Sequence, residues 1–336
     1  MLSLNPIIRL LNSSKALVMA VAIAAVCALA YFKLVPATDA MNFVKWVVAA
    51  YMAAVGIEDA GAKSAGKPAP VPEAPPVIVN IPSPVAMKDE EEFSAFTGLV
   101  IAVVNRSARV NNTDALTMTD ACAYQLRNHV APLWRIAAPM CKFFPDASKI
   151  PASAYVVAIV DQPDVDGALG YHTELSNGSV DAFIFVNPVL DNGGSVMTGP
   201  ADQVTVSSVL SHELMEMLVD PTASLWADGP QRAEGMSYAL EVADPVESDS
   251  YSINSHGVQV NVSNFVSPAW FDVVTTRTRF DYLNKLKAPF TMTPGGYMIV
   301  RNAPGSEASV FGAAMPTWKV ALKKAKMGHS RLRHTK

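Results

Sequence analysis

Residues 61–86 (GAKSAGKPAPVPEAPPVIVNIPSPVA) constrain most strongly what this chain can fold into. The stretch is dense in proline and alanine and shows neither helical nor strand periodicity. Proline fixes φ and lacks a backbone N–H, so such a run stays semi-extended and buries little surface. It predicts a linker between an N-terminal module, residues 1–60, and a globular module that begins near residue 87.

The N-terminal module contains an apolar run over residues 16–32 with basic residues on both sides. At about 1.5 Å of rise per residue, a helix over residues 16–35 just spans a bilayer core of roughly 30 Å. A cleaved signal peptide is the alternative, because small-x-small patterns occur at 28–30 and 35–37. The long segment before the run and a second apolar stretch after it favour a retained anchor.

The second apolar stretch, residues 43–57, is short for a membrane span and contains Lys45. It predicts the second arm of a hairpin, an interfacial helix or a packing helix. With one span, the positive flank at Arg9 and Lys15 keeps the N-terminus in the cytoplasm and exports the rest, whereas two spans keep the rest inside. We expect one span, the lipid bilayer as a partner, and the C-terminal domain outside the cytoplasm.

Composition and charge exclude some partners. The chain has 336 residues, 50% hydrophobic and 17% charged, which is enough apolar material for one large domain or two modest ones. Its net charge of −4 provides no global positive field, so we expect no nucleic-acid partner. The basic tail, residues 311–336, is interpreted as solvated and disordered; attraction of anionic lipid or a cell-wall polymer is the alternative.

The cysteines do not form a framework. Three cysteines are too few for a disulfide scaffold, and their spacing does not match a metal motif. Cys122 and Cys141 would pair in an oxidising compartment, but two unpaired core thiols are the favoured interpretation.

The globular module, residues 87–310, combines strand and helix patterns without regular alternation. Strands are predicted at 98–110, 154–160, 181–190 and 295–301, and helices at 113–136 and 201–220. Asp202 is the expected N-cap of the second helix, and Pro221 ends it. Strands first, a central helix next and an irregular C-terminal half predict an α+β fold.

The helix at 201–220 carries the candidate chemistry. His212 and Glu216 are four residues apart, so they project side by side and can share one cation. Glu213 directly follows His212, the position from which the general base of HExxH enzymes activates water. Because glutamate replaces the second histidine of that motif, the site is harder and more anionic than His₂Glu. Zn²⁺ is expected, with Mn²⁺ or Ca²⁺ as alternatives.

A third ligand is needed, and residues 239–247 (ALEVADPVE) supply the candidates. Glu241 is the favoured metal ligand. Asp244 is the alternative, at a spacing suited to steadying His212 from outside the ligand set. Asp220 lies two turns beyond His212, but Pro221 directly after it makes a helix-ending role more natural.

Six segments together resemble an uncharacterised group of bacterial and phage zincin-like metallopeptidases. They are GALGYH, FIFVNP, SHELMEMLVDP, YALEVADPVESDSY, VSNFVSPAWFD and APFTMTPGGYMIVR, and the resemblance covers roughly residues 154–301. It implies a sheet packed on the active-site helix, with an edge strand beside the substrate cleft. That arrangement would put Gly170, Tyr171 and His172 near the metal. The membrane module resembles phage holin segments.

Two functions are therefore open. The first is a membrane-anchored zinc metallopeptidase that hydrolyses peptide or cell-wall peptide bonds, in a host envelope or a phage virion. Its metal ligands would come from His212, Glu216, Glu241 and Asp244, and its catalytic candidates are Glu213, His172 and Tyr251. Tyr251 is the candidate oxyanion stabiliser, with a packed tyrosine as the alternative. The second function is a non-catalytic structural or adhesion protein of a virion or envelope on the same fold.

Overall fold

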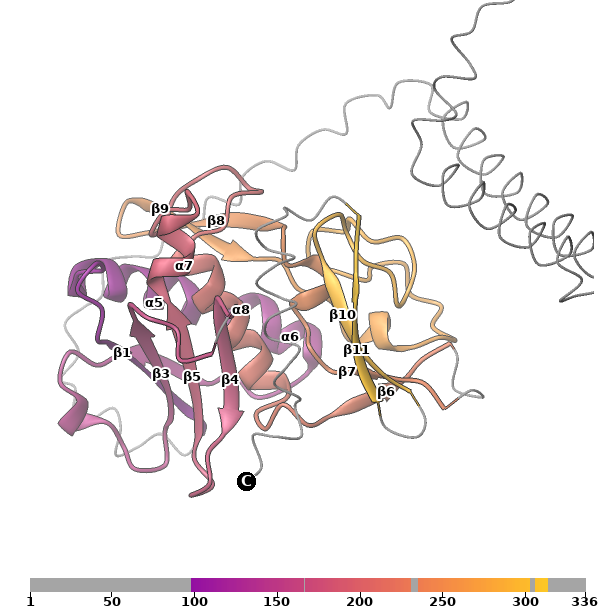
Figure 1. Cartoon of the computed structure of the whole chain (residues 1–336), viewed down its shortest axis with the longest axis horizontal. Coiled ribbons are helices and arrows are strands. Elements are labelled where there is room, and N and C mark those ends of the chain that lie inside the picture. The colour runs from indigo at the N-terminus through magenta and orange to yellow at the C-terminus, as the bar shows by residue number, and fades with distance from the viewer. Residues whose placement is uncertain (1–97, 166, 231–234, 303–305, 314–336) are drawn as a thin grey trace, which may run out of the picture. The chain divides into compact units, whose positions relative to one another are not determined.

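The computed structural model describes residues 98–313 apart from 166, 231–234 and 303–305 (Figure 1). The predicted membrane segments, the linker and most of the basic tail lie outside these described residues. None of the helices within the described ranges is long and apolar enough to cross a membrane. Sheets and a few helices make up the described part, which confirms the α+β class.

A five-stranded sheet forms the first half of the described chain, with the order β2-β1-β3-β5-β4. Its strands are β1 (Val100–Asn105), β2 (Met140–Phe143), β3 (Tyr155–Val160), β4 (Gly170–Glu174) and β5 (Val180–Phe185). All pairings are parallel except that of β4, which runs antiparallel to β5 at one edge. The structure confirms the strands expected near 98–110 and 154–160 in shortened form. β2 was not predicted, and β4 was implied only by the family resemblance, as an edge strand near residues 170–172.

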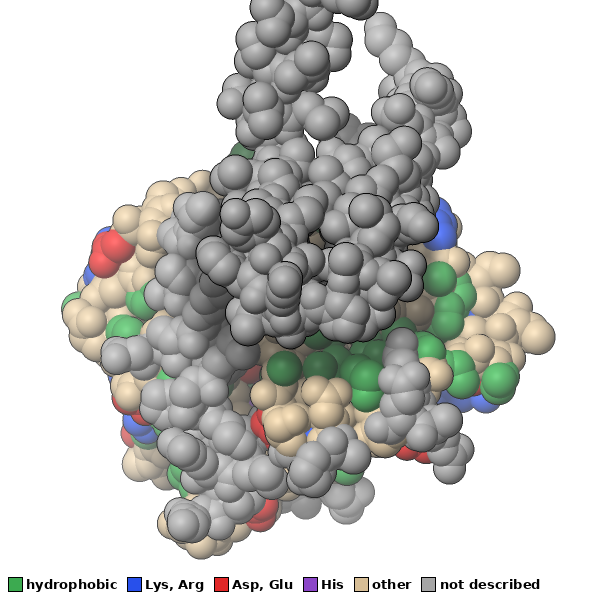
Figure 2. All heavy atoms as spheres, turned by 45° about the vertical axis from the view of Figure 1, so that its right-hand side comes forward, with side chains coloured by type: hydrophobic (Ala, Val, Ile, Leu, Met, Phe, Trp, Pro, Cys, Tyr) green, Lys and Arg blue, Asp and Glu red, His purple; other side chains and the backbone are tan. Residues whose placement is uncertain are grey.

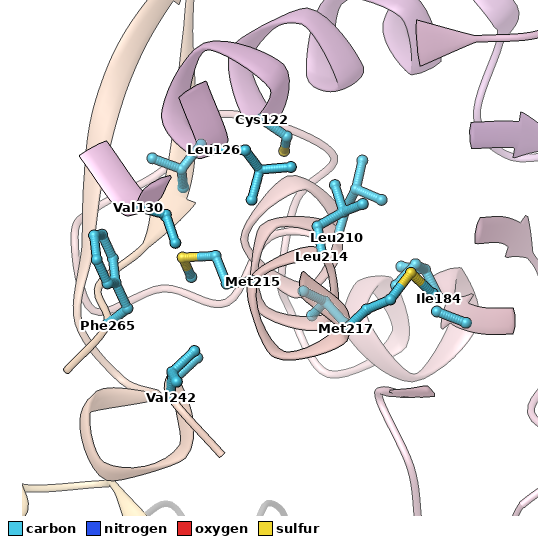
Figure 3. Packing of buried hydrophobic residues seen from close by; sticks show 14 of the residues in the cluster. Cys122, Leu126, Val130, Ile184, Leu210, Leu214, Met215, Met217, Val242 and Phe265 are labelled. Atoms are coloured by element: carbon cyan, nitrogen blue, oxygen red, sulfur yellow. The ribbon is translucent and has the colours of Figure 1, made fainter. Parts of the chain in front are cut away.

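Two helices, α5 (Asn112–Gln125) and α8 (Val206–Val219), pack on one face of this sheet (Figure 1). Alternate strand residues point to that face, because successive side chains of a strand face opposite sides. Ile184 of β5 thus joins Leu210 and Leu214 of α8 in one hydrophobic cluster (Figure 3). A fully buried side chain of this size contributes about 1.5–3 kcal/mol, so the cluster fixes α8 against the sheet.

The helix predicted at 113–136 is interrupted. It runs as α5, then a π-helical turn η1 (Leu126–Val130), then α6 (Ala131–Trp134). Arg135, with a φ of 55°, ends it in the left-handed conformation. A π turn inserts one extra residue into the helical repeat and changes which side chains face inward.

Two sequence-based boundaries were wrong. Residues expected to extend a strand to 190 form the helix α7 (Val186–Asp191) instead. Pro188 is tolerated in this first turn, because the first N–H groups of a helix have no intrahelical partner. The N-cap of α8 is Thr205 rather than Asp202: the Thr205 hydroxyl accepts from the Ser208 amide, and the Ser208 hydroxyl accepts from the Thr205 amide.

The second half contains shorter strands. The hairpin of β8 (Ser250–Ser255) and β9 (Val258–Ser263) packs on α5 and α8. A four-stranded antiparallel sheet has the order β11-β10-β7-β6. Its strands are β6 (Trp226–Asp228), β7 (Ser237–Ala239), β10 (Tyr297–Asn302) and β11 (Ser306–Phe311). Short 3-10 turns are η2 (Ala147–Lys149), η4 (Asp244–Val246) and η5 (Pro268–Phe271).

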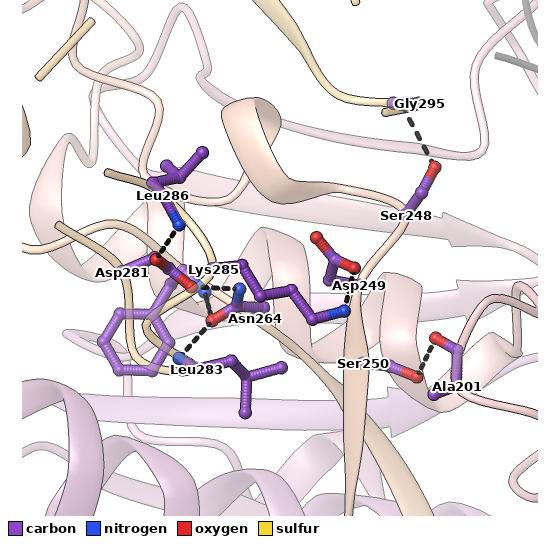
Figure 4. A network of polar contacts seen from close by, with 11 residues as sticks. Ala201, Ser248, Asp249, Ser250, Asn264, Asp281, Leu283, Lys285, Leu286 and Gly295 are labelled. Atoms are coloured by element: carbon purple, nitrogen blue, oxygen red, sulfur yellow. Dashed lines mark hydrogen bonds and ion pairs between the residues drawn. The ribbon is translucent and has the colours of Figure 1, made fainter. Parts of the chain in front are cut away.

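Polar contacts hold the loops after β9 together (Figure 4). Asn264 donates to Asp281 at 2.8 Å, and the other carboxylate oxygen of Asp281 accepts from the Leu286 amide at 2.8 Å. Both side chains are fully buried. Buried polar groups that satisfy one another in this way stabilise and rigidify a loop.

The two described cysteines are core residues. Cys122 and Cys141 are both free and buried, which confirms the favoured interpretation. Burial raises the pKa of the Cys141 thiol to about 12, so it stays protonated and unreactive. Figure 2 shows a band of hydrophobic side chains in the lower right part of the described surface, with acidic and basic side chains scattered around it.

Candidate metal site

Helix α8 carries three ionisable side chains into the interior. The exposed fractions of His212, Glu213 and Glu216 are 7%, 4% and 4%. Their helix is held by the apolar cluster on its other faces, so these side chains cannot turn outward without unpacking it. Charged groups at this depth require partners or a bound ion, because burial alone disfavours their charged forms.

The first group of ligand atoms surrounds His212. Its Nε2 lies 3.1 Å from Oε2 of Glu216 and 3.2 Å from Oδ1 of Asp244, which comes from η4. Donors placed tetrahedrally at roughly 2.1 Å from Zn²⁺ lie about 3.4 Å apart. Both distances from His212 are close to the separation that one shared ion would impose, and the donor atoms of Glu216 and Asp244 lie within 4.8 Å of each other. The Ala243 amide donates to Oε1 of Glu216 at 3.1 Å, which orients that carboxylate.

The second group surrounds His172 on the edge strand β4. One ligand atom each from His172, Glu216 and Glu241 lie within 4.8 Å of one another. Nε2 of His172 donates to the Asp220 carbonyl at 2.9 Å, so Nδ1 is the ring atom left to face the carboxylates. Nδ1 lies 3.4 Å from Oε2 of Glu213. Glu216 thus belongs to both groups.

Glu213 borders a small cavity of about 20 Å³, which has room for about one water molecule. The cavity is lined by Leu169, Gly170, Val204, Ser208, Val209, His212, Glu213, Glu247 and Ser263. A Cβ added at Gly170 would lie 2.9 Å from Oε1 of Glu213. The absence of a side chain at Gly170 therefore lets the Glu213 carboxylate lie directly against β4.

Negative charge dominates the electrostatics of the two groups. Burial lowers the pKa of His172, but its hydrogen bond with Glu213 and the charge of Glu241 outweigh burial and raise that pKa to about 9. Burial also opposes the charged form of His212, yet Glu216 and Asp244 raise its pKa well above the ordinary value. These carboxylates favour positive charge at both rings, and a divalent cation supplies the same charge.

Glu216 itself is hard to ionise. Burial raises its pKa to about 8; the attraction of His212 opposes this effect, and the charges of Asp244 and Glu241 add to it. A metal ligand must be deprotonated, so a bound cation would replace the proton that this environment otherwise favours.

The structure sorts the sequence-based candidates. His212 and Glu216 lie together as expected, but Asp244 rather than Glu241 completes their group, and Glu241 lies with His172. Both carboxylate oxygens of Asp220 accept backbone hydrogen bonds, from Ser224 and Leu225, which fits the helix-ending role.

Tyr251 lies elsewhere. Its hydroxyl accepts from Nε2 of Gln125 at 3.1 Å and lies 2.7 Å from Nδ1 of His129. Its ring stacks on Tyr282 at a centroid distance of 5.0 Å. The structure therefore does not bring Tyr251 together with the His212 group, and its contacts match the packed-tyrosine alternative.

Tyr297 is a residue of the site that the sequence did not reveal. It is buried and hydrogen-bonded to Asp244, and burial raises its pKa well above the usual range, so the phenol remains a donor. A Cβ at Gly296 would lie 2.2 Å from the Pro245 carbonyl oxygen. The Gly295–Gly296 pair at the start of a strand was the available signal, because glycine there marks close backbone approach.

Comparison with protein-family models, curated proteins and solved structures gave no match for the chain. The resemblance to zincin-like metallopeptidases stays a prediction. The donor types indicate which ion fits: imidazole with carboxylates suits Zn²⁺ or Mn²⁺, whereas Ca²⁺ prefers oxygen ligands alone.

Proposed function

We propose that the protein is a membrane-anchored, metal-dependent peptidase whose globular domain is zincin-like. The observation that carries the proposal is the convergence of donors from His212, Glu216 and Asp244, with Glu213 beside them at the cavity. Zn²⁺ is the cofactor that this donor set favours, with Mn²⁺ as the alternative. The substrate would be a peptide or the peptide part of a cell wall.

Each residue has a defined task in this proposal. A bound Zn²⁺ supplies a Lewis acid that polarises the scissile carbonyl and makes water more acidic. Glu213 follows His212 by about 100° around the helix, so its carboxylate would face the attacking water rather than the ion. There it would take a proton from the water and pass it to the leaving amine. His172, with Nδ1 3.4 Å from Glu213, orients that base.

The arrangement of the sheet supports a peptide as substrate. Helix α8 packs beside β4 and β5, and among the residues that the structure describes β4 pairs with β5 alone, along one side. The free side of an edge strand offers N–H and C=O groups that can pair with an extended peptide. The antiparallel edge strand next to α8 is also what a zincin-like domain requires.

A second function has one observation in its favour. Glu241 and Asp244 are 7% and 2% exposed, and the cavity has a volume of only about 20 Å³. A peptide reaches these groups only if neighbouring segments move. This burial favours a non-catalytic structural or adhesion protein of a virion or envelope. The peptidase remains the better candidate because Glu213, which hydrolysis needs, borders the cavity.

The proposed location follows from the sequence. The apolar run at 16–35 and its basic flank favour a single anchor with the globular domain outside the cytoplasm. A host envelope or a phage virion would both provide peptide or cell-wall substrates in that location.

Hydrolysis assays on Glu213→Gln test the proposal. The full-length protein is assayed on casein and a panel of peptidoglycan peptides at several Zn²⁺ and Mn²⁺ concentrations. Glutamine keeps the shape of the side chain but cannot accept the proton, so we expect retained metal and a rate loss on the order of 10²-fold or more. The control is the same type of change on the neighbouring strand β4: Glu174→Gln should leave the rate unchanged.

Two results would go against the peptidase. Undiminished hydrolysis by Glu213→Gln would exclude the mechanism. No hydrolysis by the wild type anywhere in the panel would favour the structural or adhesion protein.

A further inference from the structure

The two groups of ligand atoms share only one residue. His212 and Asp244 form a group with Glu216, and His172 and Glu241 form another group with the same Glu216. Within each group the ligand atoms lie within 4.8 Å of one another. We propose that the site binds two divalent metal ions that share Glu216, a proposal that rests on the metal-dependent function above. The first ion would bind at His212 and Asp244, and the second at His172 and Glu241.

The orientation of His172 is independent support for the second ion. Its Nε2 donates to the backbone carbonyl of Asp220 at 2.9 Å, and the ring is buried. Metal-ligating histidines usually make this contact, because a bonded N–H on one side fixes the tautomer and turns the other nitrogen to the ion. β4 holds the ring in place through its pairing with β5, in which His172 lies opposite Ala182.

Charge balance favours two ions over one. Glu213, Glu216, Glu241 and Asp244 are all at most 7% exposed, so four carboxylates share one buried region. Histidines bind metal in their neutral form and offset none of that charge. One divalent ion would neutralise half of the negative charge when all four are ionised, and two would neutralise it fully. Uncompensated buried charge is strongly destabilising, so the second ion has an electrostatic reason to bind.

A single-ion alternative makes a different prediction. In that case His172 stays an imidazolium paired with Glu213, and Glu241 does not contribute to metal affinity. In the two-ion site, Nδ1 of His172 binds the second ion in place of its contact with Glu213, and Glu241 is a ligand of the same ion. Loss of either residue therefore removes one of the two equivalents.

Metal counting on the full-length chain separates these alternatives without an activity assay. The protein is stripped with a chelator, titrated with Mn²⁺ alone, freed of unbound ion and analysed for metal and by electron paramagnetic resonance. We expect two equivalents and a spin-coupled signal, because ions in shared two-metal sites lie about 3.5–4 Å apart. His172→Gln and Glu241→Gln should each retain one equivalent with an uncoupled signal, and Glu216→Gln should bind neither ion tightly.

Glu174→Gln is the matched control on β4 and should keep both equivalents. If His172→Gln does not fold, as judged by circular dichroism, Glu241→Gln removes a ligand of the same ion with a smaller change. One equivalent in the wild type would overturn the two-ion site, whichever variant loses it, and would leave the metal-dependent function standing. No bound metal in the wild type would overturn both.

Discussion

Helix α8 lies between two buried polar regions that contain the same residue type, histidine, in opposite electrostatic settings. The first, here the neutral network, consists of Gln125, His129, Ser211 and Tyr251. The second, here the charged cluster, consists of His172, His212, Glu213, Glu216, Glu241 and Asp244. Adjacent residues of the helix, Ser211 and His212, belong to different regions.

The neutral network is complete within the protein. Ser211 donates to Oε1 of Gln125 at 2.7 Å, and Nε2 of Gln125 donates to the Ser263 carbonyl at 2.8 Å and to Tyr251. Burial, with a smaller contribution from Arg279, lowers the pKa of His129 to about 4, so the ring is neutral at physiological pH. Neutral groups that satisfy one another need no ligand.

The charged cluster behaves differently because carboxylates surround its histidines. The pKa of His172 is raised to about 9, although its ring is as buried as that of His129. The comparison shows that the groups facing a buried histidine, rather than its residue type or exposed fraction, set the direction of its pKa shift, and we propose that they also separate a structural role from metal binding. The charged cluster reaches charge balance only with added cations or protons.

The largest expected effect comes from comparing one substitution in the charged cluster with one in the neutral network. Glu216→Gln removes the residue common to both ligand groups. We expect metal affinity and hydrolysis to fall by more than the roughly 10–100-fold that follows loss of an outer partner of a ligand. Tyr251→Phe, the matched change in the neutral network, should keep metal and activity and cost about 1 kcal/mol of stability. Metal analysis, hydrolysis rates and denaturant unfolding measure these outcomes. Similar metal loss in both variants would show that the charged cluster and the neutral network do not differ in metal binding.

A smaller effect is expected at the contact between β4 and the charged cluster. The Cβ in Gly170→Ala would lie 2.9 Å from Oε1 of Glu213 and 3.0 Å from the Phe183 carbonyl oxygen, so the carboxylate of the proposed general base must shift. Misplacement of a catalytic group by about 1 Å can cost up to 10²-fold, and we expect a loss of about tenfold in kcat with unchanged metal content. Loss of metal instead of kcat would mean that Gly170 supports the ligands rather than the base.

The sequence predicted those site residues that lie close together along the chain and missed the grouping of those that lie far apart. His212, Glu213 and Glu216 share one helix, so their spacing alone placed His212 and Glu216 side by side and Glu213 about 100° around the helix from His212. Asp244 and His172 come from η4 and β4, whose positions depend on tertiary packing that local patterns do not encode. Local periodicity did not reveal the short strand β4, which only the family resemblance implied as an edge strand near Gly170–His172. The shift from Glu241 to Asp244 within the first group has the same origin.

The fold was predictable to a similar degree. Hydrophobic periodicity gave β1, β3 and α8, because their buried faces repeat with the period of the element. It did not give the end of β5, where Phe185 passes into α7 without a break in the apolar pattern. The oxyanion role for Tyr251 was inferred from residue type, and the structure instead places that hydroxyl with Gln125 and His129.

A pH dependence of stability is expected from the neutral network. The folded-state pKa of His129, about 4, lies below the ordinary value of 6.5, so the unfolded chain binds more protons between these values. The contribution of His129 to stability is therefore full above pH 6.5 and is lost as the pH falls toward 4. His129→Gln should lower stability at pH 7 and flatten this dependence in melts of the chelator-treated protein. An equally steep dependence in the variant would assign the effect to other groups.

Thermal unfolding of the full-length, chelator-treated protein with and without Zn²⁺ or Mn²⁺ tests most directly whether the charged cluster is a metal site. An ion at 100 times its Kd stabilises the folded state by about 2.7 kcal/mol. For a domain of this size class, that corresponds to a rise in Tm of roughly 5–11 °C. We predict this rise in the wild type and in Tyr251→Phe, and none in Glu216→Gln. An unchanged Tm in the wild type, or the same rise in Glu216→Gln, would contradict a metal site at the charged cluster.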